Sequence, residues 1–169
     1  GAVGHFQLVA GLGLALQPMP LPPMPRIAPA PLRDDDALAR AWRSLSERRT
    51  AHTSHAFASA LTRTLLAGEH VEVFRVADLA HPGRIAALAP LCRSAGLLAR
   101  WRMVGACEVF EPGDALYESP ESADRLAARI TADRRAICLD RVPASSQLIP
   151  ALRRALRGRG LLLVRPGVP

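Results

Sequence analysis

The amino-acid sequence predicts one α/β domain of the α+β type, in which a mixed sheet with an antiparallel meander is flanked by helices. Its 169 residues suit a single domain. The 49% of hydrophobic residues and 22% of charged residues are typical of a globular chain rather than a disordered one. Apolar residues recur at helical spacing in some segments and in short β-branched runs in others, so both kinds of element are expected.

The N-terminal segment is expected to lie outside the domain. An apolar run over residues 6–16 is too short to cross a bilayer and is interrupted by glycines. Seven prolines follow within residues 18–31, and they favour extended structure over a sheet interior. Residues 1–25 are therefore predicted to be a poorly ordered leader and proline-rich linker. The domain is placed at residues 26–169, with residues 26–32 as a first edge strand.

Two helices are predicted next. Three aspartates at residues 34–36 can cap a helix whose apolar residues recur at the right spacing up to about residue 49. Ser54 can cap a second helix, which Gly68 ends. Together the two patterns indicate a helix-helix unit.

Strands dominate the middle of the chain. Residues 70–77, 84–92 and 101–110 read as three strands joined by turns, and they predict an antiparallel meander. Ser119 followed by Pro120 predicts the start of another helix. The rest of the pattern is typical of alternating elements: a strand at residues 136–140, a helix capped by Ser145 or Ser146, and a strand at residues 161–165.

Charge and cysteine content limit the function classes. The formal charge is +7, and all 22 basic residues are Arg. Because they are spread along the chain, a dedicated nucleic-acid surface is not favoured. The three cysteines, Cys92, Cys107 and Cys138, lie far apart without a CxxC pair, so they are expected to be buried small side chains in a reducing compartment. No metal site is predicted, because His52 and His55 lack a second pair of ligands.

Four short segments follow one another in an order that carries a family resemblance. They are Ala-Trp-Arg-Ser-Leu at residues 41–45, Ile-Ala-Ala-Leu-Ala-Pro-Leu at 85–91, Leu-Asp-Arg-Val-Pro at 139–143 and Arg-Gly-Arg-Gly at 157–160. With the order of elements, these segments resemble the N-terminal lobe of bacterial FemAB-like or CelD-like acyltransferases of the GNAT superfamily. The resemblance implies a GNAT-like lobe, a cytoplasmic protein, and a second lobe beginning near the end of this sequence, which is mainly responsible for the acyl-donor chemistry.

The resemblance also implies where an acyl-CoA donor would bind. In the superfamily, a loop of pattern Arg/Gln-x-x-Gly-x-Gly/Ala follows the fourth strand and turns its backbone N–H groups toward the pyrophosphate. Here the equivalent stretch was expected at residues 111–121, which lacks the glycine spacing and contains four carboxylates and two prolines. Like charges would oppose donor binding. No catalytic or cofactor-binding residue is therefore predicted in this chain, and acyl-CoA is implied only for the whole enzyme.

The leading hypothesis is thus a non-catalytic N-terminal lobe of a GNAT-type N-acyltransferase, which transfers an acyl group from a CoA thioester or aminoacyl donor to an amine. Its partner would be a C-terminal catalytic lobe or a second copy in a homodimer, docked on an exposed apolar patch. Glu108, Glu111 and Tyr117 are candidates for the acceptor groove. Two alternatives stay open: a self-sufficient single-domain N-acetyltransferase, and a nucleic-acid-binding module that uses the basic cluster at residues 153–159.

Overall fold

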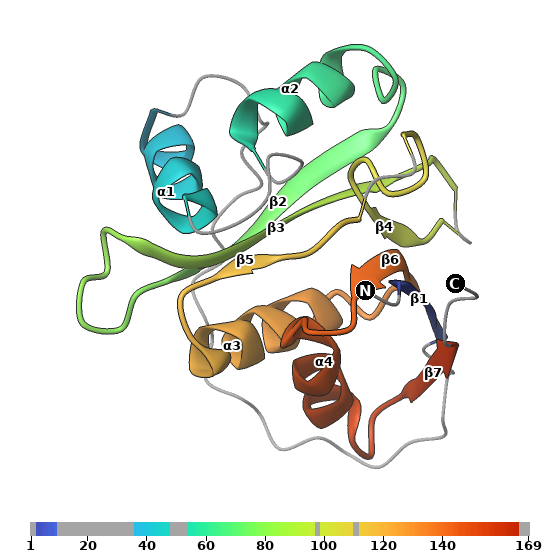
Figure 1. Cartoon of the computed structure of the whole chain (residues 1–169). Helices are drawn as coiled ribbons and strands as arrows, with labels where there is room; N and C mark the ends of the chain where they lie inside the picture. The colour runs from blue at the N-terminus through green and yellow to red at the C-terminus, as the bar shows by residue number, and fades with distance from the viewer. Residues whose placement is uncertain (1–2, 10–35, 48–53, 97–98, 110–111, 166–169) are drawn as a thin grey trace.

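The structure is a computed structural model that describes residues 3–9, 36–47, 54–96, 99–109 and 112–165. Figure 1 shows these parts as four helices and seven strands. In chain order they are β1 (Val3–Val9), α1 (Asp36–Ser46), α2 (His55–Arg63), β2 (His70–Ala77), β3 (Ile85–Arg93), β4 (Trp101–Met103), β5 (Leu116–Tyr117), α3 (Pro120–Thr131), β6 (Ile137–Pro143), α4 (Leu148–Leu156) and β7 (Leu161–Arg165).

The strands form one mixed sheet in the order β2-β3-β4-β6-β1-β7. All neighbours along this path are antiparallel except β4 and β6, which are parallel. Strand β5 also pairs with β3, at Ala87 and Leu88, nearer the start of β3 than the residues that pair with β4. The predicted class, a mixed sheet with an antiparallel meander and flanking helices, is confirmed.

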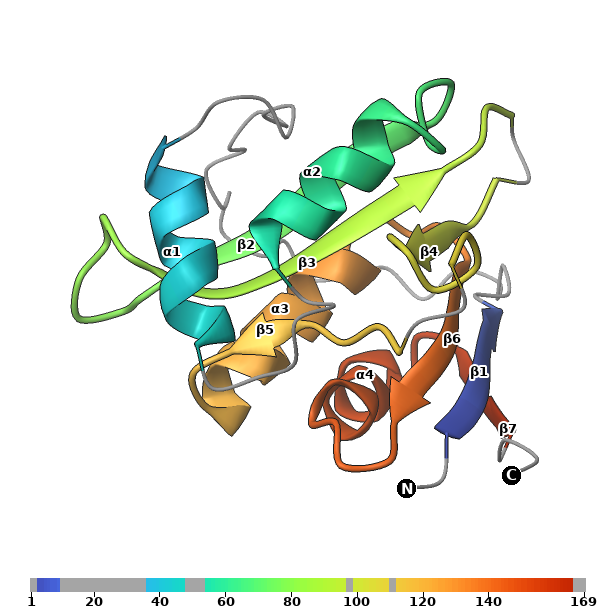
Figure 2. The same cartoon turned by 45° about the horizontal axis from the view of Figure 1, so that its top comes forward.

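Helices cover both faces of the sheet (Figures 1 and 2). Side chains of β2 and β3 alternate between the two faces because successive residues of a strand point in opposite directions. Phe74 and Leu91 join the cluster formed with α3 and α4, whereas Val73, Leu88 and Cys92 join the cluster formed with α1 and α2. The middle of the sheet is therefore buried on both sides, which explains why β3 is apolar almost throughout.

Local capping fixes the helix starts that the sequence indicates. The Ser54 hydroxyl accepts the N–H of Phe57 at the start of α2. At the start of α3, Ser119 and Ser122 form a capping box, in which each side chain accepts the other residue's backbone N–H. The predicted starts at Ser54 and Ser119 are confirmed.

Three features differ from the sequence-based expectation. Residues 3–9, which were assigned to the leader, form strand β1 between β6 and β7, because paired strands on both sides satisfy its backbone groups. The predicted edge strand at residues 26–32 lies outside the described residues. The third meander strand ends at Met103 instead of continuing to residue 110, and residues 116–117 form the additional strand β5.

Candidate functional site

The candidate site lies where the parallel strands β4 and β6 separate. They are in register at Trp101 with Ile137 and at Arg102 with Cys138. Beyond Met103 the chain leaves the sheet in a turn over residues 104–109, while β6 continues to Pro143. Gly105 has a φ of 89°, a conformation that costs a residue with a Cβ roughly 1–2 kcal/mol. The pairing of the two parallel strands thus ends before this glycine, which leaves a gap between β6 and the turn.

An ion-pair network neutralises the basic side chain at this point. The Arg102 guanidinium donates to both carboxylate oxygens of Glu69, at 2.6 and 2.7 Å, and to Oε1 of Glu108 at 3.0 Å. Oε2 of Glu108 accepts the backbone N–H of Gly105 at 3.0 Å. The Glu108 side chain is only 10% exposed, so one buried carboxylate satisfies both the arginine and the turn's backbone donor.

Two thiols gather on the same side of the gap. Sγ of Cys107 lies 3.5 Å from Oδ2 of Asp140, and Sγ of Cys138 lies 3.7 Å from the same oxygen. Burial raises the pKa of both thiols, and the negative charge of Asp140 raises each pKa further. Although the cysteines are far apart in the sequence, the fold places these two beside one carboxylate.

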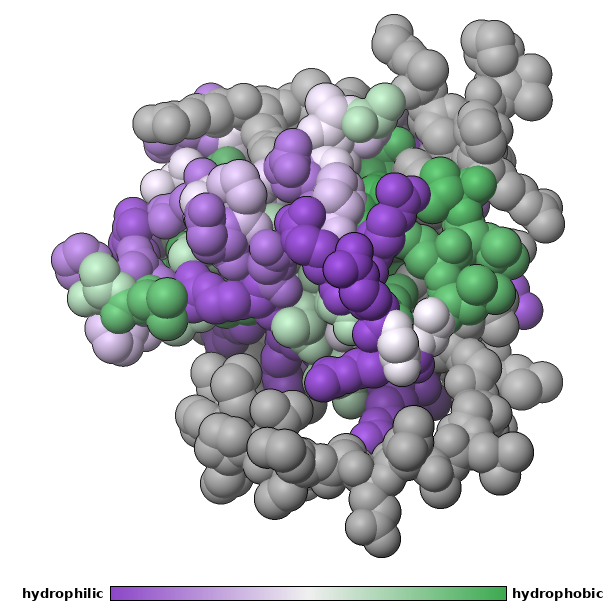
Figure 3. Space-filling model, turned by 90° about the horizontal axis from the view of Figure 1, so that it is seen from below, coloured by the Kyte–Doolittle hydropathy of each residue, from purple (hydrophilic) through white to green (hydrophobic). Residues whose placement is uncertain are grey.

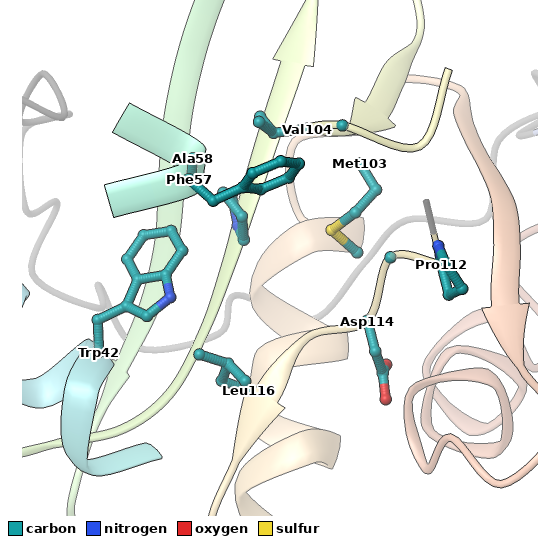
Figure 4. Close-up of a pocket in the computed structure, with 11 residues that line it drawn as sticks. Trp42, Phe57, Ala58, Met103, Val104, Pro112, Asp114 and Leu116 are labelled. Atoms are coloured by element: carbon teal, nitrogen blue, oxygen red, sulfur yellow. The ribbon is translucent and has the colours of Figure 1, made fainter. Parts of the chain in front are cut away.

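A small pocket opens beside the turn, between α1, α2 and the segment that leads into β5 (Figure 4). Its wall is largely apolar, with Trp42, Phe57 and Met103 among the lining side chains. Gly113 packs so closely that an added Cβ would lie 2.7 Å from Cγ of Met103. The pocket has room for about one water molecule, so an extended cofactor arm does not fit without movement of its walls.

A second polar cluster joins the segment before β5 to the start of α4. The buried carboxylate of Asp114 accepts the Ser146 hydroxyl at 2.6 Å, and the Tyr117 hydroxyl lies 3.5 Å from its other oxygen. Tyr117 accepts the backbone N–H of Gln147 at 2.9 Å, and Ser146 accepts that of Leu148 at 3.1 Å. Because these contacts satisfy N–H groups at the start of α4, their local role is helix capping.

The two predicted acceptor-groove residues that the structure describes, Glu108 and Tyr117, do not come together. Arg102 pairs in register with Cys92, on the face covered by α1 and α2, and Glu108 binds to Arg102 there. Tyr117 pairs in register with Ala87, on the face covered by α3 and α4. Glu111 lies outside the described residues. Glu108 and Tyr117 therefore have separate partners on opposite faces of the sheet.

The residues directly after β4 were missed at the sequence level, although the signal was present. Residues 102–107 read Arg-x-x-Gly-x-Cys, with the glycine that ends the strand three residues after the arginine. Trp101, Met103 and Val104 favoured a strand that continues to residue 110, which moved the expected loop to residues 111–121. In the structure, Gly105 ends the strand and places this pattern at the parallel pair.

The basic cluster at residues 153–159 is only partly available to an anion. Arg154 donates to Oδ1 of Asp124 through Nε at 2.9 Å and Nη2 at 2.6 Å, which joins α4 to α3. Arg153, Arg157 and Arg159 are exposed near the C-terminal end of α4, where the helix dipole disfavours anions. This arrangement is that of a solvated helix end and does not favour nucleic-acid binding.

Two further searches concerned the described residues alone. No group of three or more His, Cys, Asp or Glu side chains among them could hold a metal ion. In the same part of the chain, no helix has both the length and the apolar character needed to cross a membrane.

Comparisons with models of protein families, with curated proteins and with solved structures found no match to this chain.

Proposed function

We propose that this chain acts as the non-catalytic N-terminal lobe of a cytoplasmic GNAT-type N-acyltransferase and supports a catalytic second lobe. The reaction of the whole enzyme would be acyl transfer from a CoA thioester or aminoacyl donor to an amine. Support comes from the order of the elements, with two helices before a meander and alternating helices and strands after it. It also comes from the hydrogen bonds and ion pairs that the residues after β4 make within the chain.

Residues 102–107 resemble the superfamily's donor-loop pattern except at the last position, where Cys107 stands instead of Gly or Ala. The internal use of the polar groups in this segment is the observation that carries the proposal. A CoA pyrophosphate at this loop would need the Gly105 N–H and a basic side chain. Glu108 already accepts that N–H and also binds Arg102, whose Nη2 donates to both carboxylate oxygens of Glu69. An incoming anion would have to displace a nearly buried carboxylate and would still face like charge, so binding is opposed electrostatically.

An exposed apolar patch supports the partner in the proposal. Leu161, Leu163 and Val164 of β7 are 55%, 40% and 39% exposed. Figure 3 shows a hydrophobic patch on the side of the molecule where β7 lies. Because β7 ends the sheet, its outer edge offers backbone groups and apolar side chains together, which suits a packed second lobe.

Isothermal titration calorimetry with acetyl-CoA tests the proposal. The purified chain is expected to show no saturable heat, because Glu108 and Glu69 oppose the pyrophosphate. Glu108→Gln keeps a hydrogen-bond acceptor for Gly105 but removes one charge, so it is expected to raise affinity to a measurable level. Glu118→Gln is the matched control, since Glu118 also pairs with an arginine, Arg84, at 2.8 Å.

Saturation of the wild-type chain at micromolar acetyl-CoA would overturn the non-catalytic assignment. Turnover of acetyl-CoA with a panel of amines would then support the alternative, a self-sufficient single-domain N-acetyltransferase. If Glu118→Gln raised the affinity for acetyl-CoA as much as Glu108→Gln, the negative charge after β4 would not be what excludes the donor.

Light scattering tests the docking patch. The isolated chain is expected to self-associate at high concentration through the exposed side chains of β7, and Leu163→Gln should weaken that association. Leu79→Gln is the matched control, because Leu79 is 80% exposed in the turn between β2 and β3. A clean monomer at all concentrations, or equal effects of both substitutions, would count against β7 as the docking surface.

A further inference from the structure

The two thiols beside Asp140 form a pair that the established chemistry of cysteine can join. Both sulfur atoms lie within 3.7 Å of the same carboxylate oxygen, so the distance between them is limited to the sum of two short contacts. They come from different elements: Cys138 is in β6, and Cys107 is in the turn after β4. The register between Arg102 and Cys138 brings these elements together.

We propose that Cys107 and Cys138 are a redox pair that closes into a disulfide on reaction with a low-molecular-weight disulfide such as oxidised glutathione. The bond would tie the turn of residues 104–109 to β6 across the gap between the parallel strands. This inference concerns a covalent modification and does not depend on the acyltransferase assignment.

The reaction balances through two thiol–disulfide exchanges. The Cys107 thiolate attacks one sulfur of oxidised glutathione, which forms a mixed disulfide and releases one glutathione thiolate. The Cys138 thiolate then attacks Sγ of Cys107, which forms the internal disulfide and releases the second glutathione. Two protein thiols lose two electrons and two protons, and one glutathione disulfide becomes two thiols.

The positions of Cys107 and Cys138 in the fold indicate which thiol reacts first. Cys107 is in a turn, where Val109 N–H donates to the Gly105 carbonyl, and the backbone bond from this turn to β3, Val104 N–H to the Pro90 carbonyl, comes before Cys107. It can therefore approach β6 without loss of a strand pair. Cys138 is in a strand paired on both sides, with β4 and with β1, and stays in place as the resolving thiol.

Cys92 provides an internal control. It has no exposed surface and packs in the cluster with α1 and α2. Burial raises the pKa of its thiol to about 12. A small oxidant therefore cannot reach Cys92 in the folded chain, and its thiolate is scarce at neutral pH.

The charged surroundings set the rate of closure. Burial raises the pKa of both thiols and Asp140 raises each further, whereas Arg102 lowers that of Cys107 and Arg100 lowers that of Cys138. Among the described residues, the charged groups that act on the pair include Asp140, Arg102 and Arg100, with Glu108 bound to Arg102. Since both pKa values are raised overall, closure should be slow at pH 7 and accelerate with rising pH. Asp140→Asn should speed closure at pH 7 several-fold.

The experiment treats the reduced full chain with oxidised glutathione, then counts thiols and maps tryptic peptides. Trypsin places the three cysteines in separate peptides, residues 85–93, 103–125 and 136–141. The wild type and Cys92→Ala are each expected to lose two thiols, to gain no glutathione mass and to yield the joined peptides 103–125 and 136–141. Cys138→Ser is expected to hold one glutathione on Cys107.

Several results would overturn the proposal. Stable glutathione on both cysteines would show that the thiols cannot meet. A disulfide between two chains, or one that includes Cys92, would place the reactive pair elsewhere. Unchanged thiols in the wild type at pH 9, with the fold intact by circular dichroism, would show that the pair is inert.

Discussion

The turn after β4 gives a quantitative test of the structure through the substitution Gly105→Ala. The φ of 89° at Gly105 costs an alanine roughly 1–2 kcal/mol. The added Cβ would also lie 3.1 Å from Cδ1 of Leu61 and 3.2 Å from Cε1 of Phe57, both on α2. Overpacking of this kind costs about 1–3 kcal/mol. The free energy of unfolding should therefore fall by about 2–5 kcal/mol.

The matched control is Gly158→Ala. Gly158 has a φ of 72°, but its added Cβ would meet nothing within 4 Å, so only the backbone cost of about 1–2 kcal/mol remains. Urea unfolding can be followed by the fluorescence of Trp42 and Trp101, which are 1% and 2% exposed. Gly105→Ala should lower the midpoint clearly more than Gly158→Ala. Equal losses of stability in the two variants would refute the packing of the turn against α2. An unchanged midpoint in Gly105→Ala would refute the positive φ at Gly105.

Two further predictions concern other polar contacts. Ser146→Ala removes the hydroxyl that donates to Asp114 at 2.6 Å and accepts the Leu148 N–H, so it should cost about 1–2 kcal/mol in the same urea assay; an unchanged midpoint would contradict the capping role. Hydrogen bonds from Arg84 and from a backbone N–H hold the pKa of Asp78 at about 2 instead of 3.8. Its contribution to stability is present above pH 3.8 and is lost as the pH falls through 2. NMR titration should show this low pKa in the wild type and a higher one in Arg84→Gln; equal values in both proteins would contradict the pairing.

Most elements could be predicted from sequence because their signals are local. The β-branched run of Val71, Val73 and Val76 marks β2, and β2 has the predicted bounds, His70–Ala77. Serine caps mark the starts of α2 and α3 because a side-chain acceptor there satisfies the first N–H groups of the helix. Such patterns need no knowledge of distant partners.

Elements defined by distant partners could not be predicted in the same way. Strand β1 is a strand because β6 and β7 lie on either side of it, and those partners are more than a hundred residues away. Strand β5 has only two residues, which are too few for any periodic signal. Tertiary pairing decides both cases, as it commonly does for short or isolated strands.

The candidate site likewise combines features with a local sequence signal and features that depend on distant residues. The sequence identified Glu108 as a notable carboxylate, but not its partner Arg102 in β4, which also binds Glu69 from the turn before β2. The meeting of Cys107 and Cys138 depends on the parallel register of β4 with β6, which no spacing in the sequence encodes. Only Gly105 gave a local signal for the end of the strand, and the strand pattern of Trp101, Met103 and Val104 favoured a longer strand instead.

The charge around the end of β4 is opposite in sign to that of the chain. The chain carries a formal charge of +7, yet Glu69 and Glu108 both bind Arg102 at this point, and Asp140 lies beside Cys107. Exposed arginines elsewhere can attract CoA phosphates at low salt without a specific site. Donor binding should therefore be measured at about 0.15 M salt and above, where such contacts are screened. Affinity that persists there and responds to Glu108→Gln reports on this loop, whereas affinity that vanishes with salt reports on the basic surface.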